Sequence, residues 1–101
     1  MEMQFSLQGK TGMCRLAEDL DMQSAEDFVH DNKAFLAQNL GMKELVFELS
    51  AVEFMDSTGV GALMQVIRVA REQGVVCRLA GYSPEIQDAL ELIGVFGVLE
   101  E

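Results

Sequence analysis

An Asp-Ser-Thr-Gly run followed by a second glycine is the part of the chain whose residue types could support chemistry. It lies in "FMDSTGVGALMQV", residues 54–66, between an apolar run and the expected start of a helix. Ser, Thr and Asp are preferred helix N-caps, so Ser57 could serve only to accept a hydrogen bond from the first-turn amides. Gly59 and Gly61 each cost about 1 kcal/mol relative to alanine within a helix, so helix stability alone does not explain them. They indicate an open backbone around Ser57 that another protein or a phosphate can approach.

The hydroxyl of Ser57 is also a candidate site of phosphorylation. A helix N-terminus offers unpaired amides and partial positive charge, which tolerate a phosphoryl group. Phosphorylation would add roughly 1.5 to 2 negative charges and three acceptor oxygens, which would change a docking surface more than the local fold. Asp56 could orient the Ser57 hydroxyl or help to position a kinase's metal and nucleotide, and a role as a second helix cap is equally consistent with its position.

Other chemistries fit the sequence less well. Met55 replaces the first glycine of a GxSxG nucleophile elbow, and His30 is the only histidine that could assist a hydrolase. "GVGALM" lacks the third glycine and the lysine of phosphate-binding loops. The acidic clusters at 18–21 and 26–27 lack EF-hand spacing and fit a solvated acidic face. We therefore predict no catalytic residue, no metal site and no cofactor, and hence no enzymatic activity.

Composition limits the class of protein and of partner. The 101 residues, half of them apolar, are enough for a single domain spanning 1–101. The formal net charge of -10 argues against nucleic acid and anionic membranes as partners and favours a protein with a basic face. No apolar run is long enough to span a membrane and no signal peptide is recognisable, so we expect a cytoplasmic protein. Cys14 and Cys77 lack metal-binding spacing and are expected to be buried free thiols.

The pattern of apolar residues predicts an α/β domain. Strands are expected at 3–8 and 13–19, forming a hairpin at the sheet edge, and then at 44–49 (a central strand) and 75–81. Helices are expected at 25–40, 57–73 and 84–93, the first with Ser24 and Asp27 as a capping box and the last with Ser83 as N-cap. A short strand at 96–100 would be a fifth. Right-handed crossovers should make the strands after the hairpin parallel, so we predict a mixed sheet of four to five strands with three helices packed on it.

The helix after Ser57 has a wider apolar surface than one sheet contact requires. Residues 60, 63, 64, 67 and 70 form the stripe expected to face the core, and Ala62, Val66 and Val69 form a second stripe beside it. Two explanations stay open. A neighbouring helix covers the second stripe, or the stripe is an exposed patch next to Ser57 where a partner docks.

The region from "LVFELSAVEFMDSTGVGALM" to "YSPEIQDALELIGV" resembles the core of a STAS domain, the fold of bacterial anti-sigma factor antagonists, and the likeness covers nearly the whole chain. The most specific feature is "DSTGVG" at 56–61. In such antagonists the serine after the aspartate is phosphorylated by an anti-sigma kinase of the GHKL type and dephosphorylated by a PP2C-like phosphatase. The resemblance therefore implies phosphorylation at Ser57, with Asp56 beside it and Gly59 and Gly61 shaping the loop.

Two departures from the family pattern concern the rims of the domain. The family usually has "GxLD" after its second strand, whereas "EDLD" keeps Leu20 and Asp21 and puts Glu18 in place of the glycine. This suggests a different turn at that rim. The short C-terminus leaves little room for the closing helix of many STAS domains, which could leave an edge or an apolar face open for a partner or for a second copy in a homodimer.

The function implied is a partner switch. Unphosphorylated, the domain would bind an anti-sigma factor or serine kinase, and phosphorylation of Ser57 would release it. The predicted partner-binding residues are Asp21, Asp56, Thr58, Gly59, Val60, Gly61, Ala62, Val66 and Val69. The alternative is a constitutive, unphosphorylated STAS subunit of a lipid-transport ABC complex, which would need the same helix face but no modifiable serine.

Overall fold

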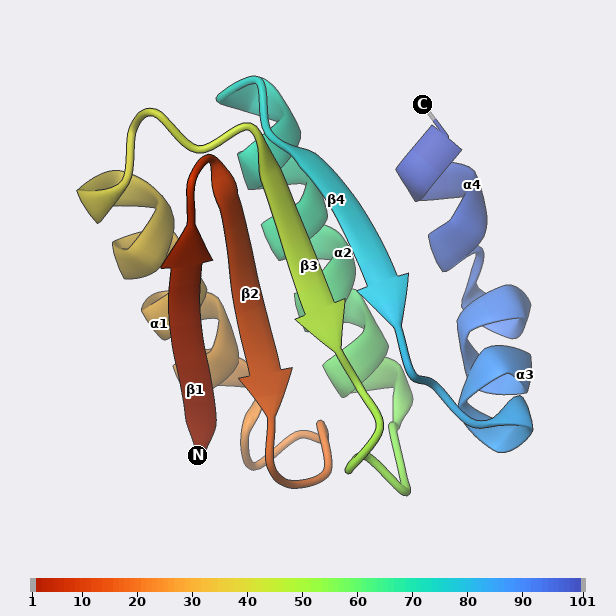
Figure 1. The fold of residues 1–101 in the computed structure, drawn as a ribbon. Coiled ribbons are helices and arrows are strands. Elements are labelled where there is room, and N and C mark those ends of the chain that lie inside the picture. The colour runs from red at the N-terminus through yellow and green to blue at the C-terminus, as the bar shows by residue number, and fades with distance from the viewer. Residues whose placement is uncertain (1, 101) are drawn as a thin grey trace.

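Within residues 2–100, which the computed structural model describes, the chain forms four strands and four helices. Their order along the chain is shown in Figure 1: β1 (Met3–Gln8), β2 (Thr11–Leu16), α1 (Ala25–Gln38), β3 (Glu44–Glu48), α2 (Ser57–Glu72), β4 (Val76–Ala80), α3 (Pro84–Ile93) and α4 (Val95–Glu100). The predicted α/β class is confirmed, with one helix more than expected.

The sheet is mixed, with the strands in the order β1-β2-β3-β4. β1 and β2 are antiparallel and Gln8 lies opposite Thr11, so only Gly9 and Lys10 form the turn. Gly9 has a φ of 60°, which suits the first central position of a type II′ hairpin turn. β3 pairs in parallel with β2 and with β4. The predicted edge hairpin, central strand and parallel order are therefore confirmed, although β2 runs from 11 to 16 and not from 13 to 19.

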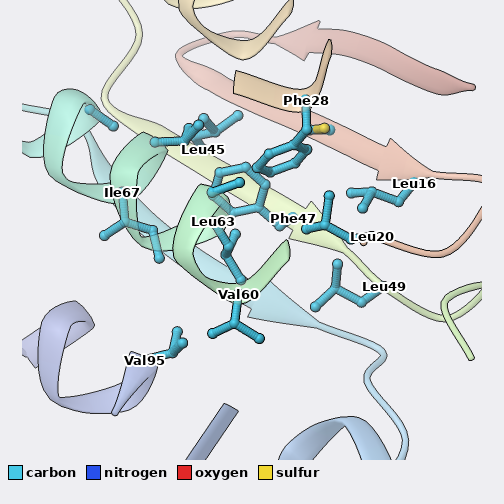
Figure 2. Close-up of a cluster of buried hydrophobic side chains, with 14 of the residues drawn as sticks. Leu16, Leu20, Phe28, Leu45, Phe47, Leu49, Val60, Leu63, Ile67 and Val95 are labelled. Atoms are coloured by element: carbon cyan, nitrogen blue, oxygen red, sulfur yellow. The ribbon is translucent and has the colours of Figure 1, made fainter. Parts of the chain in front are cut away.

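One face of the sheet carries the core. α1 and α2 lie behind the sheet in Figure 1, and α3 and α4 lie beside β4. In β2, Cys14 and Leu16 point into the core and are fully buried, whereas Arg15 between them is exposed. The phenyl rings of Phe28 from α1 and Phe47 from β3 meet with their centroids 5.9 Å apart (Figure 2). Each large side chain buried in this way contributes about 1.5–3 kcal/mol, so this contact anchors α1 to the sheet.

The C-terminal segment 96–100, predicted as a possible fifth strand, belongs to a helix. Gly94 ends α3 in the left-handed conformation with a φ of 84°, and the chain then turns into α4. Val95 and Val98 are buried, three residues apart, as a helix packed on its neighbours requires. The Arg71 side chain of α2 donates a hydrogen bond to the carbonyl of Val98. The strand prediction was wrong because this short apolar run was assigned the period of a strand.

The start of α1 also differs from the prediction. Ser24 is the N-cap residue, but its side chain makes no capping hydrogen bond, so the capping-box prediction was wrong. Its hydroxyl instead donates to the carbonyl of Asp19 and accepts from the amide of Asp21, at 3.0 and 3.1 Å. Ser24 therefore holds the turn before the helix, whereas Ser83 caps α3 as predicted by accepting from the amide of Ile86 at 3.2 Å.

Candidate functional site

Ser57 is the first residue of α2, and it is not the helix cap. Asp56 occupies the N-cap position with extended backbone angles, and its Oδ1 accepts a hydrogen bond from the amide of Gly59 at 2.7 Å. The Ser57 side chain is exposed, and its hydroxyl has no hydrogen-bond partner among the residues that the structure describes. The capping role considered for Ser57 belongs to Asp56, which leaves the serine hydroxyl free for other chemistry.

Asp56 also ties α2 to a second loop. Its Oδ2 accepts from the amide of Met22, 34 positions earlier in the chain, at 3.0 Å. The segment between β2 and α1 is thereby held against the N-terminus of α2. One oxygen of Asp56 caps α2, in agreement with the capping interpretation of this residue, and the other holds the β2–α1 segment in place.

A second aspartate fastens the same two loops. Asp19 Oδ1 accepts from the amides of Glu53 and Phe54 at 2.9 and 3.0 Å, and the amide of Leu20 donates to the carbonyl of Phe54 at 3.3 Å. Leu20 and Met55 form an isolated parallel bridge. Because β2 and β3 are parallel, the loops after them lie at the same edge of the sheet, and these contacts join them into one platform. Sequence reasoning missed this role of Asp19.

Asp21, a predicted partner-binding residue, forms a turn within this platform. Its half-buried carboxylate accepts from the amides of Gln23 and Ser24 at 2.9 and 3.2 Å. Glu18, which stands where the family glycine was expected, accepts at its Oε1 from the amide of Glu2 at 3.3 Å. Asp21 thus shapes the rim next to Ser57 and keeps part of its surface accessible.

The two glycines after Ser57 have different roles. A Cβ on Gly59 would lie 2.0 Å from the carbonyl oxygen of Leu20, so this glycine lets α2 approach the platform closely. A Cβ on Gly61 would meet nothing within 4 Å. The open backbone predicted for both glycines is therefore found only at Gly61; the prediction for Gly59 was wrong, since the β2–α1 loop covers it.

α1 packs on α2, and the second apolar stripe of α2 is largely buried. In this stripe Val66 is fully buried, Ala62 is 6% exposed and Val69 is half-buried; Val60, in the core-facing stripe, is fully buried as well. A neighbouring helix therefore covers the excess apolar surface, and the alternative of a broad exposed patch is wrong. Val60, Ala62 and Val66, proposed as partner-binding residues, support the surface from beneath and do not form it.

A groove remains between α1 and α2 beside the start of α2. It encloses about 540 Å³, and Ala25, Val29 and Ala62 give it an apolar lining. Thr58 and Gly61 also line it, and both are exposed. The empty space over Gly61 is thus part of a hollow that begins one residue after Ser57.

Two exposed apolar side chains of the platform complete the surface near Ser57. Met22 is 71% exposed and Phe54 is 54% exposed. Large apolar side chains in such positions often mark a protein contact. They were missed because their place beside Ser57 depends on the parallel pairing of β2 with β3, although the rule that parallel strands end at one edge could have indicated it.

The two loops beside Ser57 carry negative charge. Residues 17–24 and 49–58 include five acids, Glu18, Asp19, Asp21, Glu53 and Asp56, and no lysine or arginine. A phosphoryl group on Ser57 would therefore meet no cation from these two loops, only the amides at the start of α2. The local chemistry suits a surface that changes strongly in charge on modification.

Other reactive groups lie away from this surface. Burial raises the pKa of both Cys14 and Cys77 to about 12, so both thiols stay protonated near neutral pH. The exposed His30 is 3.1 Å from the Asp31 carboxylate. Residues 2–100 contain no group of three histidine, cysteine or acidic side chains arranged to hold a metal. Nor does any helix in that range have the length and apolar character needed to cross a membrane.

Comparison with solved structures shows where this fold occurs. An anti-sigma factor antagonist from Mycobacterium paratuberculosis matches with a TM-score of 0.74 at 22% identity, covering 93% of this chain and 78% of that one. The anti-sigma factor antagonist SpoIIAA of Bacillus, in its unphosphorylated form, matches with a TM-score of 0.71 at 21% identity, covering 90% and 83%. A sulfate transporter family protein from Wolinella succinogenes matches with a TM-score of 0.78 at 19% identity, covering 93% and 75%. The shared fold therefore occurs in proteins of more than one function.

The family assignment rests on the sequence match. The model of the STAS domain family matches residues 3–100, which includes every strand and helix of the structure. The order of the strands and the position of "DSTG" between β3 and α2 agree with the resemblance noted from the sequence. The chain belongs to the STAS domain family.

Proposed function

We propose that this protein is an anti-sigma factor antagonist that works as a phosphorylation-controlled binding module, without catalytic activity of its own. The observation that carries the proposal is the free, exposed hydroxyl of Ser57 at the start of α2. Asp56 caps α2, so Ser57 can be modified without loss of the capping hydrogen bond. The likeness to antagonists of known fold supports the same kind of function.

The docking surface consists of the groups that the fold leaves accessible around Ser57. Thr58 and Gly61 lie on α2, and Met22 and Phe54 lie on the platform loops. Half-buried Asp21 and Asp56 supply negative charge at the rim. The partner is an anti-sigma factor with serine kinase activity of the GHKL type, whose matching surface carries basic groups around an apolar contact.

Phosphorylation ends binding because it puts a dianion at the centre of this surface. A buried charge without a matching cation costs several kcal/mol. Since each 1.4 kcal/mol is a factor of ten in affinity, a penalty of about 3 kcal/mol gives a switch of more than a hundredfold. A PP2C-like phosphatase would restore the binding form, and the exchange would take place in the cytoplasm.

The first test is site mapping. The protein is incubated with ATP and a GHKL-type anti-sigma kinase from the same organism, and the phosphorylated residue is located by mass spectrometry. We expect one phosphate, on Ser57, and none on the Ser57→Ala variant. Labelling of Ser57→Ala at the wild-type rate would contradict the assignment.

The second test measures affinity for the same kinase without ATP. Ser57→Ala should bind as well as the wild type, and Ser57→Asp should bind at least about tenfold more weakly, for a penalty of about 1.4 kcal/mol from a single added charge. Ser6→Asp is the matched control, because Ser6 is exposed on β1, away from the two loops beside Ser57, and the change in charge is the same. Equal losses in both aspartate variants would indicate a general charge effect. A transporter ATPase as the co-purifying partner, with Ser57 unmodified, would instead favour a constitutive transport subunit.

A further inference from the structure

The outer edge of β1 is a second interaction surface. β1 lies at one end of the sheet order and pairs only with β2, so one side of its backbone is unpaired in the described structure. We propose that a second copy of this chain pairs antiparallel with β1, which joins two four-stranded sheets into one continuous sheet.

The register of the hairpin determines which backbone groups are available. Gln8 and Thr11 close a two-residue turn and form a hydrogen-bonded pair, and the pattern then alternates along the strand. The amide of Ala17 donates to the carbonyl of Glu2 at 3.1 Å, which fits the same alternation. The N–H and C=O groups of Met3, Phe5 and Leu7 therefore point away from β2 and toward the free edge.

These three residues can pair with the same three residues of a second copy. With Phe5 opposite Phe5 of the second copy on a two-fold axis, Met3 lies opposite Leu7 of the second copy, and Leu7 opposite Met3. Each of these pairs exchanges two backbone hydrogen bonds, so the interface has about six. This register uses every outward-pointing group of β1.

The side chains of β1 favour another copy of the chain as the occupant. β1 reads MQFSLQ and has no charged residue, whereas β2, β3 and β4 each carry at least one. Edge strands that avoid association usually carry charges or proline. In a chain of net charge -10, two copies repel each other over most of their surfaces, and β1 offers a neutral strip where they can meet. The pairing would also cover Leu7, which is 44% exposed.

The opposite edge of the sheet is built differently. β4 carries Arg78, which forms an ion pair with Glu44, and α3 and α4 lie on its outer side (Figure 1). A hollow lined by Val76 and Cys77 of β4 also has Leu99 of α4 in its lining. The contrast between a charged edge that has α3 and α4 beside it and an open, uncharged one makes β1 the edge for association. None of the residues of the Ser57 surface lies on β1, so a dimer would keep that surface on each copy.

The test measures association by sedimentation over protein concentrations from about 10 μM to about 1 mM, a range that covers weak complexes. We expect a monomer–dimer equilibrium that strengthens between about 0.05 and 0.5 M NaCl, because salt screens the repulsion between the two acidic copies. Leu7→Pro should weaken the dimer at least about tenfold, since it removes an outward N–H that β2 does not use. Leu7→Lys should also weaken the dimer, because it puts a charged side chain on the edge strand.

Thr11→Lys is the matched control. Thr11→Lys adds the same charge as Leu7→Lys at another exposed position. Thr11 lies on β2, however, and β2 is paired on both sides. The substitution should leave the dimer unweakened. A chain that stays monomeric throughout, a dimer that resists both Leu7 variants, or a dimer that Thr11→Lys also disrupts would each overturn the proposal.

Disulfide formation checks the register. In the proposed pairing the exposed Gln4 faces Ser6 of the second copy in a non-hydrogen-bonded pair, close enough for a disulfide. A mixture of Gln4→Cys and Ser6→Cys proteins should cross-link faster than either variant alone. Cys14 and Cys77 should not compete at pH 8, because burial raises the pKa of each to about 12. Equal rates for the mixture and the single variants would overturn this register.

Discussion

Alanine at Gly59 and at Gly61 should change stability in opposite directions, although the two residues lie two positions apart on one helix. At Gly61 an added Cβ meets nothing within 4 Å, so the substitution brings only the helix preference of alanine, about 1 kcal/mol. At Gly59 the added Cβ lies 2.0 Å from the Leu20 oxygen and 2.6 Å from the Leu20 carbonyl carbon. Contacts of this kind are normally longer than about 3 Å, so the loop would have to move by about 1 Å.

The loop at Leu20 resists such a movement. It is held by the bond from the Leu20 amide to the Phe54 carbonyl, by the two bonds to Asp19 and by the bond from Met22 to Asp56. Overpacking against held backbone costs about 3 kcal/mol. After subtraction of the helix preference, Gly59→Ala should lose about 2 kcal/mol.

The assay is thermal unfolding followed by circular dichroism, with urea unfolding as a second measure. For a domain of this size about 1 kcal/mol corresponds to about 4 °C in Tm. We expect Gly61→Ala to raise Tm by about 4 °C and Gly59→Ala to lower it by about 8 °C. A rise in both variants would refute the argument that Gly59 is required by its contact with Leu20, and a fall in both would show that the space over Gly61 is not empty.

Two further predictions concern the clamp and the buried thiols. Asp56→Ala removes the acceptor for the amides of Gly59 and Met22. It should therefore lower the free energy of unfolding by about 1–2 kcal/mol and speed hydrogen exchange at both amides. Asp56→Asn should lower the free energy of unfolding by less. For Cys14 and Cys77 the pKa rises from 9.0 to about 12 on folding, so their stabilisation is complete below pH 9 and is lost as pH rises toward 12. Urea unfolding between about pH 8.5 and 10.5 should therefore show a steeper fall for the wild type than for the Cys14→Ala, Cys77→Ala double variant, by about 1.4 kcal/mol per thiol and pH unit above 9, and parallel curves would contradict it.

The parts of the fold that depend on local pattern were predictable from the sequence. Ser83 followed by Pro84 marked the start of α3, and the alternation in residues 3–8 marked β1. The segment at 96–100 was not, because five residues contain too little periodicity to separate a strand from a short helix. Its conformation depends on packing against α2, including the bond from Arg71 to Val98.

The candidate site divides in the same way. "DSTG" was recognised as the chemical centre because its four residues are contiguous, but the platform beside it joins segments that are 34 or 35 positions apart. The hydrogen bonds of Asp19 and the exposure of Met22 and Phe54 follow from the pairing of β2 with β3, which no local pattern contains. The buried second stripe of α2 likewise depends on where α1 lies.

Because α2 is capped by Asp56 and not by Ser57, phosphorylation of Ser57 would affect partner binding more than folding. If the Ser57 hydroxyl capped the helix, a phosphoryl group on it would remove the capping hydrogen bond of the first turn. Modification would then change both the stability of the fold and the affinity for the partner. With Asp56 as the cap, bonded to Gly59 and Met22, the first turn and the platform are held without the serine hydroxyl. A phosphate on Ser57 would then change the charge of the surface while both loops keep their contacts. Under the proposed function, nearly all of the free-energy penalty of phosphorylation then falls on binding of the partner and not on folding. A switch between two folded states requires this.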